Sequence, residues 1–399
     1  MKLCPQGVFM NILYISFPDL NGSDGSSTHV REILRNLSIN NSITVVSPTK
    51  YPPDFGNNLT FKRCGYLDIN FLRAFTFSIN AFFICCFYLL RNKCDLIYER
   101  AHFFGTGCNV SLLFNIPVVV EVNGISNETG LLPRSIAKIL HLVLSNRYSC
   151  ATHIIAVTPK LKEFLQSTYE IPSHKISVVE NGANTDLFKP MDRKSVLETL
   201  NLDANYKYIC FVGHLAPWQG VDYLIKSSPY ILSKCPNTKF VIVGEGPKFD
   251  ELVKLVNHLN ISQNYLFTGY VDYETVPFYI NASNICVAPF VIERNERIGL
   301  SALKLYEYLA CGKPVVASKI TGVEELLSTS NGGISVAPED VCDLGKTIVR
   351  LLQDDTLCEK IGTNGYKFIQ NYHSWRVAAE NVEHISCKVL NNFNKSKNS

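Results

Sequence analysis

The sequence lacks the features that mark secreted and zinc-binding proteins. Its 14 cysteines include no CxxC pair and no spacing typical of zinc ligands, so we expect free thiols in a reducing compartment. The residues before the first expected strand do not have the pattern of a secretory signal peptide, which is a basic start, an apolar stretch and a cleavage site of small residues. This argues against secretion. The residues up to Phe9 read as an unstructured extension, and Met10 is a second candidate start.

One uncharged run approaches the length of a transmembrane segment. The uncharged run AFTFSINAFFICCFYLL falls short of the ~20 apolar residues that a spanning helix needs, and it contains three polar side chains. It lies where an α/β unit places a crossover helix. The segment from Phe71 to Leu90 therefore predicts first a buried packing helix, second an in-plane contact with a membrane surface, and last a membrane span. We expect a cytoplasmic protein, either soluble or peripheral at the inner face of the membrane.

Charge of either sign is scarce. Only 18% of the residues are charged, and the net charge is +3. Residues 1–182 carry 16 Lys and Arg against 12 Asp and Glu, whereas the remainder carries 22 against 23. This small excess is not the pattern of a nucleic-acid-binding protein, but it favours an anionic substrate or an anionic lipid surface near the first half.

Short β-branched runs alternate with helical patterns in the first half of the chain, which is typical of a parallel sheet. Expected helices are residues 27–37, 74–90, a stretch after Phe104, and 135–148. The expected strands are residues 11–16, 42–48, 94–100, 117–124, 153–159 and 175–182. This order predicts a doubly wound Rossmann-like sheet.

A second alternation of the same kind follows a loop-like linker at about residues 183–205. Its expected strands are residues 206–214, 238–247, 265–271, 284–290, 314–318 and 333–338. We expect an N-terminal domain over residues 1–190 and a C-terminal domain over 191–375, with a cleft between them that receives a ligand. Residues 376–399 should form a helix that returns to the first domain, ending in a disordered tail.

Glycine turns mark the ends of several expected strands. There is no GxGxxG and no P-loop, which argues against an oxidoreductase or an NTPase. Gly25 precedes a helix expected to open near Ser27 or Thr28, and Gly213 ends the first strand of the second set. Each turn offers backbone N–H groups to a phosphate or a sugar hydroxyl. A capped surface loop is the second interpretation of the Gly25 turn. A tight strand-to-helix turn explains the glycines of residues 243–247 and 267–271 equally well.

Residues 293–318 carry the densest pattern of candidate functional groups. A polar loop with Arg294 and Arg297 leads to Gly299, and then to an expected helix with Lys304 and Glu307. These two residues are three positions apart and share a helix face. The carboxylate suits a ribose diol and the ammonium suits a phosphate. The alternative is an exposed ion pair of a few tenths of a kcal/mol.

The motifs together resemble glycosyltransferase family 4, whose members are retaining enzymes with the GT-B fold of two Rossmann-like domains. The resemblance covers nearly the whole chain. Its motifs, in matching order and spacing, are the entry at 25–30, EVNG at 121–124, ENGANTDLF at 180–188, VGHLAPWQGVDYLI at 212–225, VGEGP at 243–247 and KLYEYLACGKPVVAS at 304–318, followed by VEE.

The resemblance implies transfer of a sugar from a nucleotide sugar by metal-independent chemistry, with no cofactor. Glu307 is expected on the ribose, the backbone of residues 299–303 on the diphosphate, residues 267–271 on the base, Asn123 near the transferred sugar, and Gly25 near the phosphates. The catalytic residues would be Asn123, Lys304 and Glu307. The donor-binding residues would be Gly25, Gly213, His214, Gln219, Gly246, Tyr270, Gly299, Leu300, Ser301 and Leu303.

Three residues depart from the family pattern. His214 stands where the family commonly has an arginine, Gln219 where it has a lysine, and Gly299 where it has a first glutamate. We treat Gly299 as a variant, because a subgroup with similar KLYEY helices also lacks that acid. The two missing cations lead to the hypothesis that Lys304, with Arg294 or Arg297, supplies the positive field that the diphosphate needs.

The expected reaction moves a sugar from UDP- or GDP-sugar to a hydroxyl acceptor. A lipid-linked or cell-surface polysaccharide precursor fits the aromatic helix and the basic first half best, and no nucleic acid is expected. Two alternatives stay open: a catalytically inactive sugar-nucleotide-binding protein, and a nucleotide-sugar 2-epimerase of the same fold.

Overall fold

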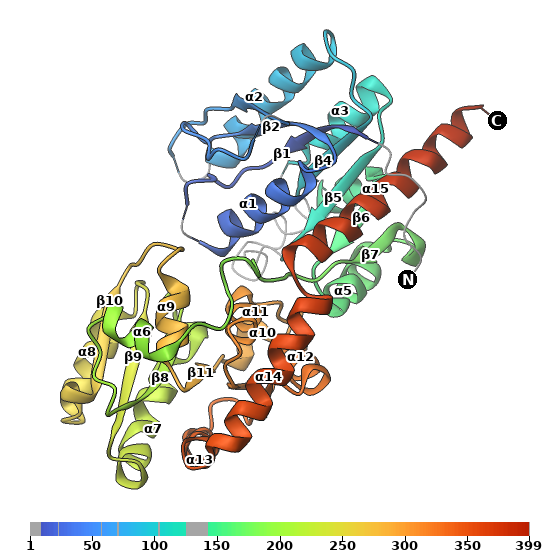
Figure 1. Cartoon of the computed structure of the whole chain (residues 1–399). Helices are drawn as coiled ribbons and strands as arrows, with labels where there is room; N and C mark the ends of the chain where they lie inside the picture. The colour runs from blue at the N-terminus through green and yellow to red at the C-terminus, as the bar shows by residue number, and fades with distance from the viewer. Residues whose placement is uncertain are drawn as a thin grey trace, which may run out of the picture. The chain divides into compact units, whose positions relative to one another are not determined.

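A computed structural model describes residues 9–22, 24–56, 58–69, 72–102, 104–124 and 143–398. The chain divides into two compact units (Figure 1). The first comprises Met1–Glu180 together with Arg376–Ser399, and the second comprises Asn181–Trp375. Each unit is built around one parallel sheet.

The sheet of the first unit has the strand order β3-β2-β1-β4-β5-β6-β7, and all of its paired strands are parallel. The order reverses between β1 and β4. The strands are β1 (Asn11–Ile15), β2 (Ser42–Ser47), β3 (Leu59–Arg63), β4 (Leu96–Arg100), β5 (Val118–Val122), β6 (His153–Ala156) and β7 (Ile176–Val178). All six expected strands are present. The sequence did not predict β3. This exposed edge strand carries polar residues and lacks the apolar run that would indicate a strand.

Helices cover both faces of this sheet. Helices α2 and α3 pack side by side on one face and α1 lies on the other (Figure 1). The helices of the unit are α1 (Gly25–Leu37), α2 (Leu72–Leu89), α3 (Thr106–Phe114), α5 (Pro159–Tyr169) and α15 (Trp375–Asn398), which begins at the last residue of the second unit. Most of the helix expected over 135–148 lies outside the described residues, as do Phe71 and the first eight residues.

Helix α2 is not the buried packing helix that we placed first. It buries only four side chains: Phe77, Ser78, Ala81 and Cys85. Only 22% of the helix is buried, and by length and composition it is the one helix in the described part of the chain that meets the criteria for a membrane span. Phe77, Ala81 and Cys85 lie at i, i+4 and i+8 and form one narrow buried stripe with Ser78 beside it, whereas Phe75, Ile79, Phe83 and Phe87 are exposed.

The prediction of a disordered C-terminal tail is also wrong. Helix α15 continues to Asn398, and the ammonium of Lys397 donates a hydrogen bond to the Asn115 carbonyl at 2.7 Å. Farther up the helix, Glu383 accepts a hydrogen bond from Asn41 at 3.2 Å. The Asn- and Lys-rich composition suggested disorder, but a long helix anchored at both points extends through it.

The second unit repeats the architecture with the strand order β10-β9-β8-β11-β12-β13, which reverses between β8 and β11. Its strands are β8 (Lys207–Val212), β9 (Thr238–Val243), β10 (Tyr265–Gly269), β11 (Ile285–Ala288), β12 (Val315–Ser318) and β13 (Gly333–Val336). The predicted fold class, two doubly wound parallel-sheet domains, is confirmed.

Apolar side chains from both faces of this sheet pack against helices. The helices are α6 (Arg193–Thr199), α7 (Val221–Lys234), α8 (Phe249–His258), α9 (Val276–Ala282), α10 (Ile292–Asn295), α11 (Leu303–Ala310), α12 (Val323–Ser330), α13 (Val341–Leu352) and α14 (Asp355–Tyr372). The expected linker over 183–205 is not a plain loop, because it contains α6, which Asp192 caps and which packs on α9.

Candidate functional site

Each sheet reverses its strand order at one point, and polar groups gather at the carboxyl ends of the strands there. In open parallel sheets this edge is where ligands bind. The candidate groups of the first unit lie beyond β1, β4 and β5, and those of the second unit lie beyond β8 and β11. The two sets are described separately.

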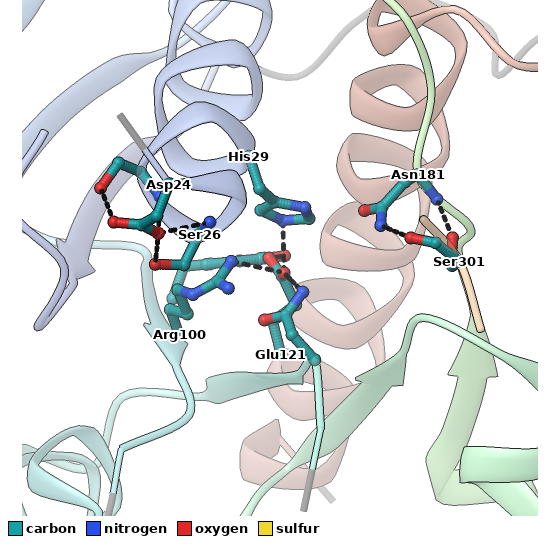
Figure 2. Close-up of polar contacts among 10 residues, drawn as sticks. Asp24, Ser26, His29, Arg100, Glu121, Asn181 and Ser301 are labelled. Atoms are coloured by element: carbon teal, nitrogen blue, oxygen red, sulfur yellow. Dashed lines mark hydrogen bonds and ion pairs between the residues drawn. The ribbon is translucent and has the colours of Figure 1, made fainter. Parts of the chain in front are cut away.

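Glu121 is the centre of the polar cluster in the first unit. Its carboxylate accepts hydrogen bonds from the Tyr98 hydroxyl and the Asn123 amide, both at 2.6 Å. His29 Nε2 lies 2.5 Å from the same carboxylate, and an Arg100 guanidinium nitrogen lies at 3.7 Å. Figure 2 shows His29 from α1 and Arg100 from β4 pointing toward Glu121. Two candidate cations therefore converge on one anion.

Glu121 stays ionised although it is buried. Burial by itself raises the pKa of this carboxyl, but His29 and Arg100 outweigh that effect and lower the pKa to about 2. The same negative charge, added to burial, raises the pKa of Tyr14 and Tyr98 well above their usual value. The tyrosine rings stack at 5.0 Å between centroids. Both hydroxyls therefore stay protonated, and the cluster is a fixed arrangement of charges.

Asn123, the expected sugar-binding residue of this unit, belongs to the same cluster. Its amide nitrogen is held by Glu121, whereas its carbonyl oxygen is buried without a hydrogen-bond partner among the described residues. An acceptor oxygen of this kind suits a sugar hydroxyl. The sequence reading missed His29, Arg100 and Glu121. A charged residue inside the apolar strand VVVEV was the available signal, because such a residue needs buried partners.

The carboxylate of Asp24 accepts hydrogen bonds from the backbone N–H groups that follow Gly25. Helix α1 begins at Gly25 rather than near Ser27, and Asp24 is the N-cap that accepts from the backbone N–H of Ser26 at 2.7 Å and of Ser27 at 3.1 Å (Figure 2). Burial raises the pKa of Asp24, but hydrogen bonds from Ser26 and Ser27 outweigh it and the pKa lies below its usual value. This capped turn already holds a negative charge where we expected a phosphate.

Lys304 lies at the strand reversal of the second unit. It is the second residue of α11, and its ammonium donates a hydrogen bond to the Gln219 side-chain oxygen at 2.7 Å. The ammonium also lies 4.0 Å from the centre of the Phe211 ring. A Cβ atom built on Gly213 would come within 2.6 Å of the Lys304 nitrogen, so this glycine gives the lysine room at the end of β8.

The expected helix with Lys304 and Glu307 is confirmed, and the alternative of an exposed ion pair is excluded. Lys304 is 9% exposed and Glu307 is 6% exposed. Burial lowers the pKa of Lys304 to about 7, although the nearby Glu307 acts in the opposite direction. The Tyr273 hydroxyl donates to Glu307 at 3.2 Å. Lys304 therefore titrates near neutral pH, where a bound anion would favour its charged form.

The loop before α11 is only partly available to a ligand. The Leu300 N–H donates to the Thr321 carbonyl at 2.9 Å, so it is used within the fold. Asn181 donates from its side chain to the Ser301 carbonyl at 2.7 Å and from its backbone to the Ser301 hydroxyl at 3.2 Å (Figure 2). Ala302, the N-cap of α11, provides no side-chain cap. The first turn of α11, including Leu303, is thus a helix N-terminus suited to an anion.

The remaining predicted residues surround this loop more loosely. His214 is exposed, and Tyr270 is 54% exposed beyond the end of β10. A Cβ atom on Gly246 would come within 2.6 Å of the Leu215 backbone, so close backbone packing accounts for this glycine. Gly299 adopts a φ of 69°, which favours glycine. Arg297 is exposed.

The described residues include no group of three or more His, Cys, Asp or Glu side chains arranged to hold a metal ion. Basic side chains of the protein itself lie at the carboxyl edges: Arg100 and the imidazole of His29 in the first unit, and Lys304 in the second. Such a site can bind an anionic ligand and orient its hydroxyl groups.

Comparison with known proteins identifies the class. Residues 23–187 match the model of Glycosyltransferase Family 4, and residues 192–368 match that of Glycosyl transferases group 1. The chain is 30% identical over 302 residues to an uncharacterised glycosyltransferase of Methanocaldococcus jannaschii, covering 73% of this chain and 75% of that protein. It is 25% identical over 296 residues to the alpha-D-kanosaminyltransferase of Streptomyces kanamyceticus, covering 69% and 75%.

Solved structures agree on the fold. Sucrose-phosphate synthase from Thermosynechococcus elongatus superposes with a TM-score of 0.79 at 19% identity, covering 96% of this chain and 100% of that one. HepE of Anabaena, solved in complex with UDP-glucose, superposes with a TM-score of 0.72 at 18% identity, covering 95% and 99%. The protein is a glycosyltransferase with the GT-B fold. More particularly, the chain belongs to the family-4-type glycosyltransferases, which take their sugar from a nucleotide sugar.

The Glu121 cluster predicts a specific pH dependence of stability. The pKa of Glu121 is about 2 in the fold against an ordinary 4.5, which corresponds to about 3 kcal/mol. Because the folded pKa is depressed, this contribution is complete above pH 4.5 and is lost as the pH falls through about 2. Glu121→Gln should lower the thermal midpoint at pH 7 by about 6 to 12 °C.

The difference between native protein and Glu121→Gln should shrink steadily in scans at pH 7, 4 and 3. Glu163→Gln, which changes an exposed glutamate on α5, is the matched control and should stay within about 1 °C of native. A midpoint for Glu121→Gln that equals the control at pH 7 would contradict the role assigned to the buried charge.

Lys304 predicts a pH dependence of nucleotide binding. Its pKa of about 7 means that, above pH 7, the free protein must take up a proton before the ammonium meets a diphosphate. The affinity for UDP, measured by isothermal titration calorimetry, should therefore fall as the pH rises from 7 to 9. Lys304→Met should bind UDP at least tenfold more weakly at pH 7 and should lose this pH dependence.

His214→Ala and Lys319→Ala are the controls for Lys304, and turnover of the donor extends the comparison. Lys304→Ala should lower turnover at least tenfold more than His214→Ala. Lys319 is exposed and pairs with Glu324, so its loss should leave both measurements unchanged. Equal losses in the Lys304 and His214 variants would refute the hypothesis that Lys304 is the main source of positive charge.

Proposed function

We propose that this glycosyltransferase transfers a sugar from UDP- or GDP-sugar to a hydroxyl group of a lipid-linked or cell-surface polysaccharide precursor, with retention of the anomeric configuration. The observation that carries the proposal is the buried Lys304 beside Gly213, at the strand reversal of the second unit. A cation that titrates near neutral pH at this edge suits a diphosphate. The UDP-glucose complex of HepE, a protein with the same fold, supports a uridine donor.

In this proposal the second unit binds the donor. Lys304 and the first turn of α11 receive the diphosphate, and Glu307 receives the ribose hydroxyls, while the region around Tyr270 holds the base. Gln219 is not a cation, but its hydrogen bond fixes the Lys304 ammonium in place. As the bond to the sugar breaks, this fixed positive charge meets the charge that develops on the leaving diphosphate. Fixed donors of this kind are worth roughly 3 kcal/mol each in catalysis.

The first unit binds the sugars in this proposal. The buried carbonyl of Asn123 accepts from a hydroxyl of the transferred sugar, and Glu121 holds that side chain in position. The Asp24 carboxylate makes the turn at Gly25 better suited to a sugar hydroxyl than to a phosphate. In a retaining transfer, the departing phosphate assists the deprotonation of the acceptor hydroxyl. Neither a metal nor another cofactor is part of the proposed reaction.

Thermal stabilisation by candidate donors tests the proposal. UDP-, GDP- and ADP-sugars should be compared, and a ligand at 100 times its Kd should add about 2.7 kcal/mol. We expect a clear stabilisation by UDP- or GDP-sugar, and transfer to an acceptor that persists in EDTA. Stabilisation by none of the three would refute a nucleotide-sugar donor.

Two other outcomes distinguish the alternatives. Binding without turnover on any acceptor would indicate a catalytically inactive sugar-nucleotide-binding protein. Consumption of the donor with no acceptor present, with a changed sugar configuration at C2, would indicate an epimerase. NMR of the anomeric proton of the product tests retention directly.

A further inference from the structure

Helices α2 and α3 leave an apolar groove between them on one face of the first unit. The groove has a volume of about 830 Å³. Its walls include Phe75, Ile79, Phe82 and Phe83 from α2, and Leu112 and Leu113 from α3. This volume falls in the range of roughly 300 to 1,000 Å³ that is usual for sites that bind small molecules.

The walls of the groove are unusually exposed for such large apolar side chains. Phe83 is 55% exposed, Leu112 is 68% exposed and Leu113 is 63% exposed. Isolated apolar residues on a surface are ordinary, but a contiguous concave group of them marks a binding surface. The groove therefore calls for an apolar ligand.

One end of the groove reaches the carboxyl edge of the sheet. Thr106, which lines the groove, lies 3.1 Å from His102 Nε2, and His102 pairs with Glu99 at 3.0 Å. An apolar chain that fills the groove would therefore have this end beside Thr106 and the buried pair of His102 and Glu99, at the carboxyl end of β4.

Basic residues follow the C-terminal ends of the two helices that form the groove. Arg91 and Lys93 follow the end of α2 and are exposed. Lys397 of α15 binds the Asn115 carbonyl directly after α3. Basic groups beside an apolar opening suit an anionic lipid surface, from which a hydrocarbon chain can enter.

We propose that this groove binds one hydrocarbon chain of the lipid-linked acceptor, with the polar end of the lipid at the carboxyl edge of the sheet. The inference deepens the proposed function and rests on it for the identity of the acceptor. A concave groove between two helices fits a single chain. Contact with a bilayer alone requires only the convex, outward-facing side chains of α2, such as Phe87. The position of the polar end distinguishes an acceptor from a lipid that merely anchors the protein.

Two matched double variants separate the groove from the rest of the apolar face. Phe83→Gln with Leu112→Gln removes two exposed side chains that line the groove. Phe87→Gln with Leu90→Gln removes two side chains that are 62% and 71% exposed but lie outside the lining. Both pairs exchange exposed apolar groups for polar ones, so neither should disturb folding. Unchanged UDP affinity would verify this.

The probe is cis-parinaric acid, a fluorescent 18-carbon fatty acid, titrated in its monomeric range. The native protein should bind it, the groove variant should bind it at least tenfold more weakly, and the control variant should stay within twofold of native. A native protein that does not bind the fatty acid, or a control variant that loses as much affinity as the groove variant, would overturn the proposal.

Association with vesicles that contain phosphatidylglycerol distinguishes contact of this face with a bilayer from binding of a single hydrocarbon chain in the groove. Both variants should associate with vesicles less well than native, because both remove apolar side chains from the same face. Vesicle association without fatty-acid binding would show that the face contacts only a bilayer, and the groove proposal would fall. Fatty-acid binding by a protein that no nucleotide sugar stabilises would refute the proposed function and leave the groove intact.

Discussion

The arrangement of this protein depends on the burial of charged groups at the reversal points of two parallel sheets. The strands around each reversal are covered on both faces, so a charge at their ends has little access to water and has to be balanced by neighbouring groups. In the first unit, Glu121 is balanced by His29 and Arg100 and by hydrogen bonds from Tyr98 and Asn123. These partners come from α1, from β4 and from the residues after β5. Their contacts with Glu121 therefore also hold these three segments in place at the carboxyl ends of the strands.

The second unit also buries a charge at its strand reversal, but that charge is positive. Its buried charge is a cation, Lys304, which is held by a neutral amide rather than by a paired carboxylate. The pKa of about 7 reflects this incomplete compensation. An anion that binds there would supply the missing partner and would raise the pKa of Lys304. Gln219, which stands at one of the departures from the family pattern, accepts the hydrogen bond of this lysine, whereas His214 at the other departure is exposed.

The apolar face of α2 and α3 follows from the same architecture. A crossover helix in a doubly wound fold needs to bury only one stripe against its sheet. Helix α2 buries Phe77, Ala81 and Cys85, yet its outward residues are also apolar. The helix is therefore more hydrophobic than the fold requires. Part of this surplus lines the groove between α2 and α3, and part of it, such as Phe87, lies outside the groove.

The sequence by itself determined the fold class, the helix with Lys304 and Glu307, and twelve of the thirteen strands that the described residues form. Buried parallel strands and strand-end glycines leave local patterns in the sequence. It also indicated the family through motifs in a fixed order. Only the tertiary structure decided which charges meet. Contacts such as Tyr98 with Glu121, or Gln219 with Lys304, join residues far apart in the chain, and no local pattern encodes them. The sequence also did not determine which apolar segments are buried. Strand β5 is buried and helix α2 is largely exposed, although both are rich in apolar residues. The exposure of a segment depends on which other parts of the chain pack against it.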